Sequence, residues 1–113
     1  MKFEIDKCLQ IINDLVIYCH SIGAYDYQID YRPGSVTSTM VVKASVKNLS
    51  DEAVADMLHE LKHTRHREME EVYWGVPGDT AGAIELSTIG IMLDRIDVFY
   101  DGELLTITAE RKG

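Results

Sequence analysis

A change of hydrophobic period within the first fifty residues most constrains what this chain can fold into. Residues 3–22 repeat apolar side chains with the 3.6-residue period of a helix, and the apolar positions cover about half of the helix surface. Gly23 follows the last periodic position, where helices commonly end. From Tyr25 onward, apolar residues alternate with polar ones, which is the period of a half-exposed strand. A helix with so wide an apolar face must pack against a sheet or against other helices.

The only two cysteines lie on the apolar side of this predicted helix. Cys8 and Cys19 are 11 positions apart, which corresponds to about 16 Å along one helix. That separation is too long for a disulfide, so we expect two buried free thiols, as in proteins of a reducing compartment. Asp14 is expected on the opposite, polar side. The apolar stripe comprises Ile5, Cys8, Leu9, Ile11, Ile12, Leu15, Val16, Cys19 and Ile22.

The following segments predict two hairpins separated by helices. A turn at Pro33 and Gly34 joins the first strand to a second one over residues 36–47. Ser50 is the expected N-cap of a helix that continues to about Val72, and residues 83–93 predict a short buried helix. The last hairpin turns at Asp101-Gly102. The remaining predicted segments are strands over residues 96–100 and 104–109, and a polar end over residues 110–113.

The predicted order is therefore α-β-β-α-α-β-β in one domain that spans residues 1–113. It corresponds to an α+β fold, a two-layer α/β sandwich with a mainly antiparallel or mixed sheet and the helices on one face. A chain of 113 residues has room for one such core.

The charge balance narrows the classes of function. The chain has 11 basic and 19 acidic residues, a net charge of -8, and a pI near 4.8. Such a surface is a poor match for nucleic acid or for anionic lipid, which both need clustered Lys and Arg. The sequence contains no apolar run of the ~20 residues that span a bilayer and no apolar signal core near Met1, so we expect a cytoplasmic protein.

One short motif has the form of a catalytic site. His59-Glu60-Leu61-Lys62-His63 matches H-E-x-x-H, in which two His one helical turn apart bind Zn²⁺ and the Glu is the general base. His66 adds a third imidazole. Glu85, in Gly82-Ala83-Ile84-Glu85, stands where a third ligand would be needed, and this stretch resembles the corresponding one of thermolysin-like metallopeptidases.

A solvated helix face is the favoured interpretation of this motif. On a helical wheel His59, His63, His66 and Glu70 fall within about 60° of one another. They lie opposite the apolar stripe of the same predicted helix, so their side chains are expected to face solvent rather than a walled cleft. A zinc site, with Glu60 as the base, is the alternative. Otherwise no cofactor is expected.

The element order resembles that of the GHKL ATPase domain, which histidine kinases, type II topoisomerases and heat-shock chaperones share. The residues that carry the resemblance are the Gly-flanked stretch 82–94 and the final hairpin, residues 96–107. The resemblance implies a related fold with a degenerate nucleotide site. The family's magnesium-binding Asn has no counterpart in residues 15–20, and its D-x-G-x-G is replaced by Ala44-Ser45-Val46-Lys47-Asn48.

The segment Glu68-Met69-Glu70-Glu71-Val72-Tyr73-Trp74 also resembles a small family of clostridial-type proteins, a resemblance that implies no activity. In the same region Tyr73, Trp74 and Asp79 are candidates for contact with a partner or ligand.

These observations favour a non-catalytic interaction or regulatory module. A minimal zinc metallopeptidase is the alternative, and an acidic inhibitor or immunity-type protein that covers a basic partner is a third hypothesis. An unpaired strand at the edge of the sheet would also allow a homodimer.

Overall fold

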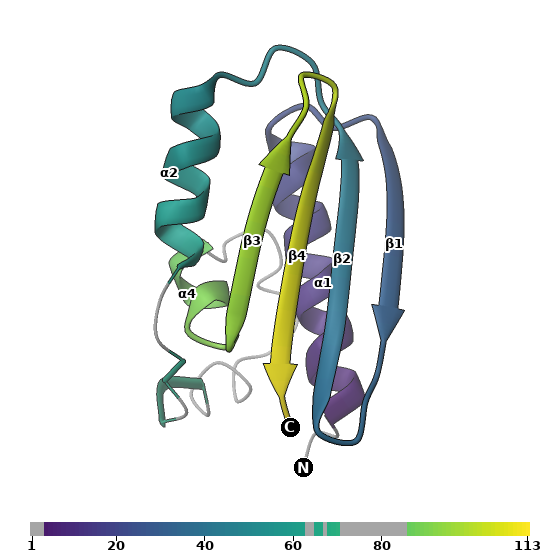
Figure 1. Cartoon of the computed structure of the whole chain (residues 1–113), viewed down its shortest axis with the longest axis vertical. Helices are drawn as coiled ribbons and strands as arrows, with labels where there is room; N and C mark the ends of the chain where they lie inside the picture. Colours follow the sequence, from purple (N-terminus) through teal and green to yellow (C-terminus); the bar gives the residue numbers. More distant parts are fainter. Residues whose placement is uncertain (1–3, 63–64, 67, 71–85) are drawn as a thin grey trace.

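A four-stranded antiparallel sheet with helices on one side forms the body of the protein (Figure 1). The structure is a computed structural model, and it describes residues 4–62, 65–66, 68–70 and 86–113. Along the chain the elements are α1 (Glu4–Ser21), β1 (Asp26–Arg32), β2 (Thr37–Ser45), α2 (Asp51–Leu61), α4 (Leu86–Gly90), β3 (Arg95–Tyr100) and β4 (Leu104–Lys112). The predicted order and the predicted α+β class are both confirmed.

Two hairpins meet at the centre of the sheet. The strand order is β1-β2-β4-β3, so the second strand of each hairpin pairs with that of the other. This arrangement places β1 and β3 at the two edges. Gly102, with a φ of 107°, supplies the left-handed turn of the second hairpin, which is the role that the Asp101-Gly102 pair predicts.

The strands divide their side chains between a buried and an open face. Residues directly opposite each other in antiparallel strands share a face, and the pairs Val42–Ile107 and Met40–Ala109 define the inner one. The helices cover this inner face, as Figure 1 shows for α1 behind the sheet. The buried residues of the two central strands are Ser38, Met40, Val42, Ala44, Leu105, Ile107, Ala109 and Arg111.

Helix α1 contributes its apolar stripe to this core, but the boundary of the stripe differs from the prediction. Ile11, Leu15 and both cysteines are buried. Ile5 and Leu9, expected in the core, are half exposed. Asp14, expected in solvent, is buried. The buried stripe of α1 is therefore shifted around the helix relative to the wheel prediction, toward Asp14 and away from Ile5 and Leu9.

Helix α2 begins as predicted and ends much earlier. The Ser50 side chain accepts a hydrogen bond from the backbone N–H of Ala53, so Ser50 is the N-cap. The helix ends at Leu61, not near Val72, since Lys62 leaves helical geometry at φ -86° and ψ 78°. The break lets the chain beyond the helix turn toward the sheet, where Arg65 reaches the carboxylate of Asp94. The sequence pattern would allow the helix to continue, but the chain instead leaves the helix and forms the Arg65–Asp94 ion pair.

The C-terminal third contains two further corrections. The helix predicted over residues 83–93 is confirmed only as Leu86–Gly90, and residues 83–85 lie outside the described part of the chain. The predicted polar end is wrong, because β4 continues to Lys112 and Arg111 is buried. Within the described ranges, no helix has the length and apolar character needed to cross a membrane.

Candidate functional site

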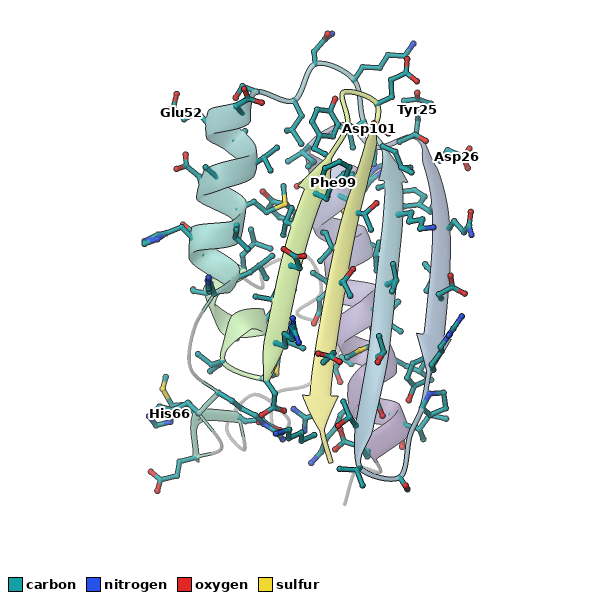
Figure 2. All side chains as sticks on the ribbon, viewed as in Figure 1. Tyr25, Asp26, Glu52, His66, Phe99 and Asp101 are labelled. Carbon is teal, nitrogen blue, oxygen red and sulfur yellow. The ribbon has the colours of Figure 1, made fainter. Side chains whose placement is uncertain are left out.

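The H-E-x-x-H motif is only partly described. His59 and Glu60 lie in the last turn of α2 and both are exposed, as predicted for a solvated face. His63 and Glu85 lie outside the described residues. His66 is exposed as well (Figure 2), and its backbone N–H donates to the carbonyl of Ile91 at 2.7 Å. Within the described ranges, no three His, Cys, Asp or Glu side chains gather as a metal site. The zinc site therefore stays a prediction.

The predicted contact residues Tyr73, Trp74 and Asp79 also lie outside the described residues. Their role stays a prediction as well.

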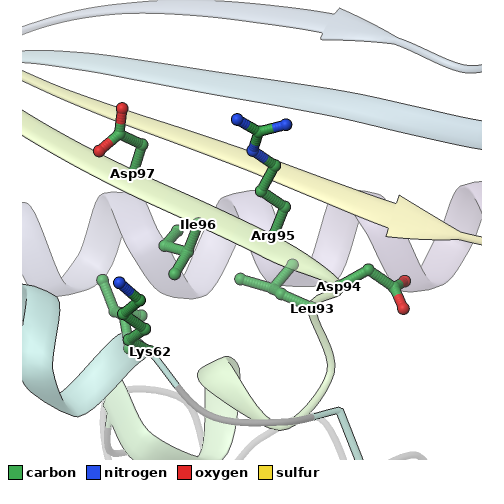
Figure 3. A pocket seen from close by; sticks show the side chains of 7 residues that line it. Lys62, Leu93, Asp94, Arg95, Ile96 and Asp97 are labelled. Atoms are coloured by element: carbon green, nitrogen blue, oxygen red, sulfur yellow. The ribbon is translucent and has the colours of Figure 1, made fainter.

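A pocket of about 360 Å³ lies between the end of α2 and the start of β3 (Figure 3). Arg95 and Asp97 extend from the opposite side of β3 to Ile96, so their charges do not converge on the pocket floor. Asp94 already accepts hydrogen bonds from Arg65 and from the backbone N–H of Lys112. The pocket thus brings charged groups close together without aligning an acid and a base on one reacting atom. Its lining is Leu61, Lys62, Leu93, Asp94, Arg95, Ile96 and Asp97.

A buried ion network, which sequence reasoning missed, lies at the end of the sheet beside the pocket. Arg111 is 1 % exposed, and its guanidinium pairs with Glu4 and with Glu70. It also donates to the backbone carbonyl of Met92 at 2.8 Å. Glu70, expected on the solvated face, is therefore buried. The alternation of β4 could have revealed Arg111, since it continues the inward series of Leu105, Ile107 and Ala109.

Arg65 extends this network to the start of β3. Its side chain is 7 % exposed and lies 3.1 Å from Glu70 and 2.8 Å from Asp94. The same guanidinium donates to the backbone carbonyl of Lys112. Among the described residues, two cations and three carboxylates therefore link α1, the start of β3, β4 and residues 65–66 and 68–70. Each guanidinium donates to more than one acceptor within the fold, so the network's role is structural.

Burial and charge set the protonation of the groups around this network. Burial lowers the pKa of Arg111, but its hydrogen bonds and charge interactions with Glu70 and Glu4 outweigh that effect, and the pKa is raised. Burial also raises the pKa of the Cys8 thiol, which lies 3.7 Å from Glu4. The adjacent Tyr31 hydroxyl has its pKa raised to about 12, mainly by burial. These groups keep their protons at neutral pH and provide no base or nucleophile there.

The outer surface of α2 is strongly acidic. Its exposed positions form two rows along the helix, in which residues four apart are neighbours. One row is Glu52, Asp56 and Glu60, and the other is Asp51, Ala55 and His59. Figure 2 shows Glu52 extending away from the sheet. We call these six residues the acidic α2 face.

The two edges of the sheet differ in their cover. Helix α2 packs against β3, whereas β1 pairs only with β2 among the described elements (Figure 1). Ile29, at the centre of β1, points to the inner face and is nevertheless 45 % exposed. Leu9 and Ile5 of α1 are exposed to a similar degree. The β1 edge is therefore open and partly apolar.

Comparison with known proteins does not assign this chain to a family. Neither a family model, nor a curated protein, nor a solved structure matches it. The resemblances to the GHKL ATPase domain and to the clostridial-type proteins consequently stay predictions, and the case for function rests on the chain's own surfaces.

Proposed function

We propose that this protein is a non-catalytic interaction module whose acidic α2 face binds a basic surface of another protein. The observation that carries the proposal is the concentration of charge on α2. Its eleven residues hold four carboxylates and no Lys or Arg. They account for half of the chain's net charge of -8.

Part of this charge is unfavourable for the helix itself: Asp51 and Glu52 lie in the first turn, where the helix dipole favours negative charge, but Asp56 and Glu60 do not. Like charges four residues apart destabilise a helix by about 0.2–0.5 kcal/mol per pair, and Asp56 has such a neighbour on both sides. No Lys or Arg of the described residues forms an ion pair with Glu52, Asp56 or Glu60. A basic partner would supply the missing cations. This intrinsic cost favours a binding role over a purely structural one.

The fold holds this face in a fixed orientation. Met57 and Leu61, on the opposite side of α2, are buried in the core, and the Ser50 cap fixes the first turn. The binding face is therefore preorganised, which lowers the entropic cost of association.

The acidity is local rather than general. The outer face of the sheet carries four carboxylates and four cations on its strands: Asp26, Asp30, Asp97, Glu110, Arg32, Lys43, Arg95 and Lys112. These charges balance, so the outer face of the sheet adds no net charge, and among the described helices and strands α2 carries the largest net charge to steer a basic partner.

The resemblance to the GHKL domain belongs to this proposal as its fold-family expectation, with the nucleotide site degenerate. Titration calorimetry with Mg²⁺-ATP tests that point. We expect no heat of binding, and tight ATP binding would contradict a non-catalytic module.

The test of the proposal first identifies the protein that contacts α2. A photo-crosslinking amino acid at Ala55, which lies within the acidic α2 face beside Asp56, should capture a basic protein in the native host. The control carries the same group at Val36, in the turn between β1 and β2. Val36 is 71 % exposed and should not capture that protein.

Charge variants then measure the contribution of the face to that complex. We expect the triple variant Glu52→Gln/Asp56→Asn/Glu60→Gln to weaken binding by tenfold or more and to flatten its salt dependence. The matched control, Glu68→Gln/Asp97→Asn/Glu103→Gln, removes the same charge from exposed sites elsewhere. Equal losses in both variants would show that only overall charge matters, and would contradict the proposal.

A further inference from the structure

The open β1 edge lacks several of the features that usually prevent strand edges from pairing, although it carries the outward-facing charges Asp26, Asp30 and Arg32. Natural edge strands are commonly short, contain Pro, or place a charge on the inward face. β1 has seven residues and no Pro or Lys. Its inward side chains are Tyr27, Ile29 and Tyr31. Such an edge is a template for another strand.

The sequence of β1 is complementary to itself. If two copies pair antiparallel about Ile29, each Ile29 lies opposite the other. Tyr27 then faces Tyr31 of the second copy, and Gln28 faces Asp30 as a hydrogen-bond partner. Asp26 faces Arg32 of the second copy at both ends of the pair. Cross-strand opposite charges and aromatic pairs are the contacts that stabilise antiparallel strands.

The faces of the two copies also match in this register. Because directly opposite residues share a face, the inward residues of one copy meet the inward residues of the other. The helical layers therefore lie on the same side of the joined sheet. Figure 2 shows Asp26 beyond the β1 edge, with no described element in front of it.

Helix α1 adds an apolar border on the same side. Glu4 of α1 pairs with Arg111 of β4, so the flank of α1 that carries Glu4 faces the β4 side of the sheet. Leu9 is five residues from Glu4, which is about 140° around a helix, so Leu9 lies on the other flank, toward β1. Leu9 and Ile29 are 48 % and 45 % exposed. A second copy placed on β1 would cover apolar surface that the monomer leaves in water.

We propose that the protein forms a symmetric homodimer in which two β1 strands pair antiparallel about Ile29 and join the two sheets into one. The interface is isologous, as two-fold symmetry requires. It is separate from the acidic α2 face, which lies beyond β3 at the other side of the molecule (Figure 1). The dimer would therefore present two acidic faces at its ends.

Charge-swap variants test the register directly by sedimentation equilibrium. Asp26→Arg places Arg opposite Arg32, and Arg32→Asp places Asp opposite Asp26, so each single variant should raise the dimer Kd by about tenfold. The double variant restores complementarity and should dimerise like the wild type. A mixture of the two single variants should form heterodimers. Both mutated residues, Asp26 and Arg32, are exposed in the monomer, so folding is preserved.

A second pair of variants tests the centre of the interface. Ile29→Lys places two cations at the two-fold axis and should leave only monomers. Val36→Lys, a matched change at another exposed apolar residue, should dimerise normally. Circular dichroism confirms that both variants are folded.

Two results would overturn the dimer. One is a wild-type chain that stays monomeric at millimolar concentration. The other is a dimer whose Kd is the same in the wild type, both single charge variants and Ile29→Lys. Neither result bears on the α2 proposal, which is tested by variants at different residues.

Discussion

The two flanks of the sheet use the same kinds of side chain for opposite purposes. On the closed flank, formed by β3, α2 and α4, Leu61 is fully buried and Arg65 is nearly so. On the open flank, formed by β1 and the adjacent side of α1, Leu9 and Arg32 are exposed. Leucine and arginine contribute to the packed interior on one flank and are exposed to solvent on the other.

This contrast shows that the element packed over a residue, rather than the residue type, decides whether its side chain is buried or exposed. Among the described elements, α2 packs against β3, whereas the outer edge of β1 has no neighbouring strand or helix. We therefore expect variants of the closed flank, and of the network attached to it, to change the free energy of unfolding. Variants of the open flank should change association instead.

The largest expected effect is the loss of the buried guanidinium. Arg111→Met should destabilise the protein by about 3 kcal/mol or more, because it leaves the buried carboxylate of Glu70 with fewer cations. Urea denaturation measures the loss. The control Arg95→Met removes an 81 % exposed side chain with a 3.7 Å ion pair and should cost less than about 0.5 kcal/mol. Equal losses of unfolding free energy in Arg111→Met and Arg95→Met would contradict a structural role for the buried network.

The next effect compares two leucines, one from each flank. Leu61→Ala should cost about 3 kcal/mol, because it leaves a cavity in the core. Leu9→Ala should cost less than about 1 kcal/mol, since Leu9 is half exposed. Thermal and urea unfolding at low protein concentration, where the chain is monomeric, provide the measurement. A larger cost for Leu9 would break the distinction between the flanks.

A pH effect is expected from α1, the helix that borders the open flank. Burial raises the pKa of Cys19 from 9.0 to about 11. The folded protein keeps this proton between pH 9 and pH 11 whereas the unfolded chain releases it. Stability is therefore full below pH 9 and falls by up to about 3 kcal/mol as the pH rises to about 11.

Urea titrations at several pH values, on the wild type and on Cys19→Ala, isolate this contribution. The variant should lose less stability than the wild type over the same interval. Identical slopes would mean that the thiol is not buried in solution.

The smallest effect has the opposite sign. Asp56→Lys should stabilise the protein by about 0.5–1 kcal/mol, because it converts two repulsive pairs, with Glu52 and Glu60, into attractive ones. The gain should largely disappear in 1 M salt. A destabilised variant would show that the acidic α2 face is not under internal repulsion, and would weaken the case for a basic partner.

Much of the fold was predictable because its signals are local. The alternation along β1 and β2 depends on nearest neighbours, and so do the cap at Ser50 and the turn at Asp101-Gly102. The exposure of His59 follows from helical geometry. His66 is exposed as well, but it lies beyond the end of α2, and Glu70, which the same helical wheel placed in solvent, is buried.

The candidate surfaces were only partly predictable. The acidic residues of α2 are visible in the sequence, but their restriction to one short helix depends on the chain leaving helical geometry at Lys62. The openness of β1 is invisible locally, because strand order and helix placement decide which edge is covered. The motif residues His63 and Glu85, and the contact candidates Tyr73, Trp74 and Asp79, stay predictions.

The sequence by itself determined the order of elements, the inward and outward faces of the strands, and the sign of the surface charge. Periodicity, caps and turns act within a few residues, so a linear reading can resolve them. Only the tertiary structure decided that Arg111 and Glu70 are buried together, and that Leu9 and Ile29 are not buried. Burial of a charge depends on a partner 41 positions away, and burial of an apolar residue depends on which element packs over it. Neither kind of burial can therefore be inferred from the local sequence of one helix or strand.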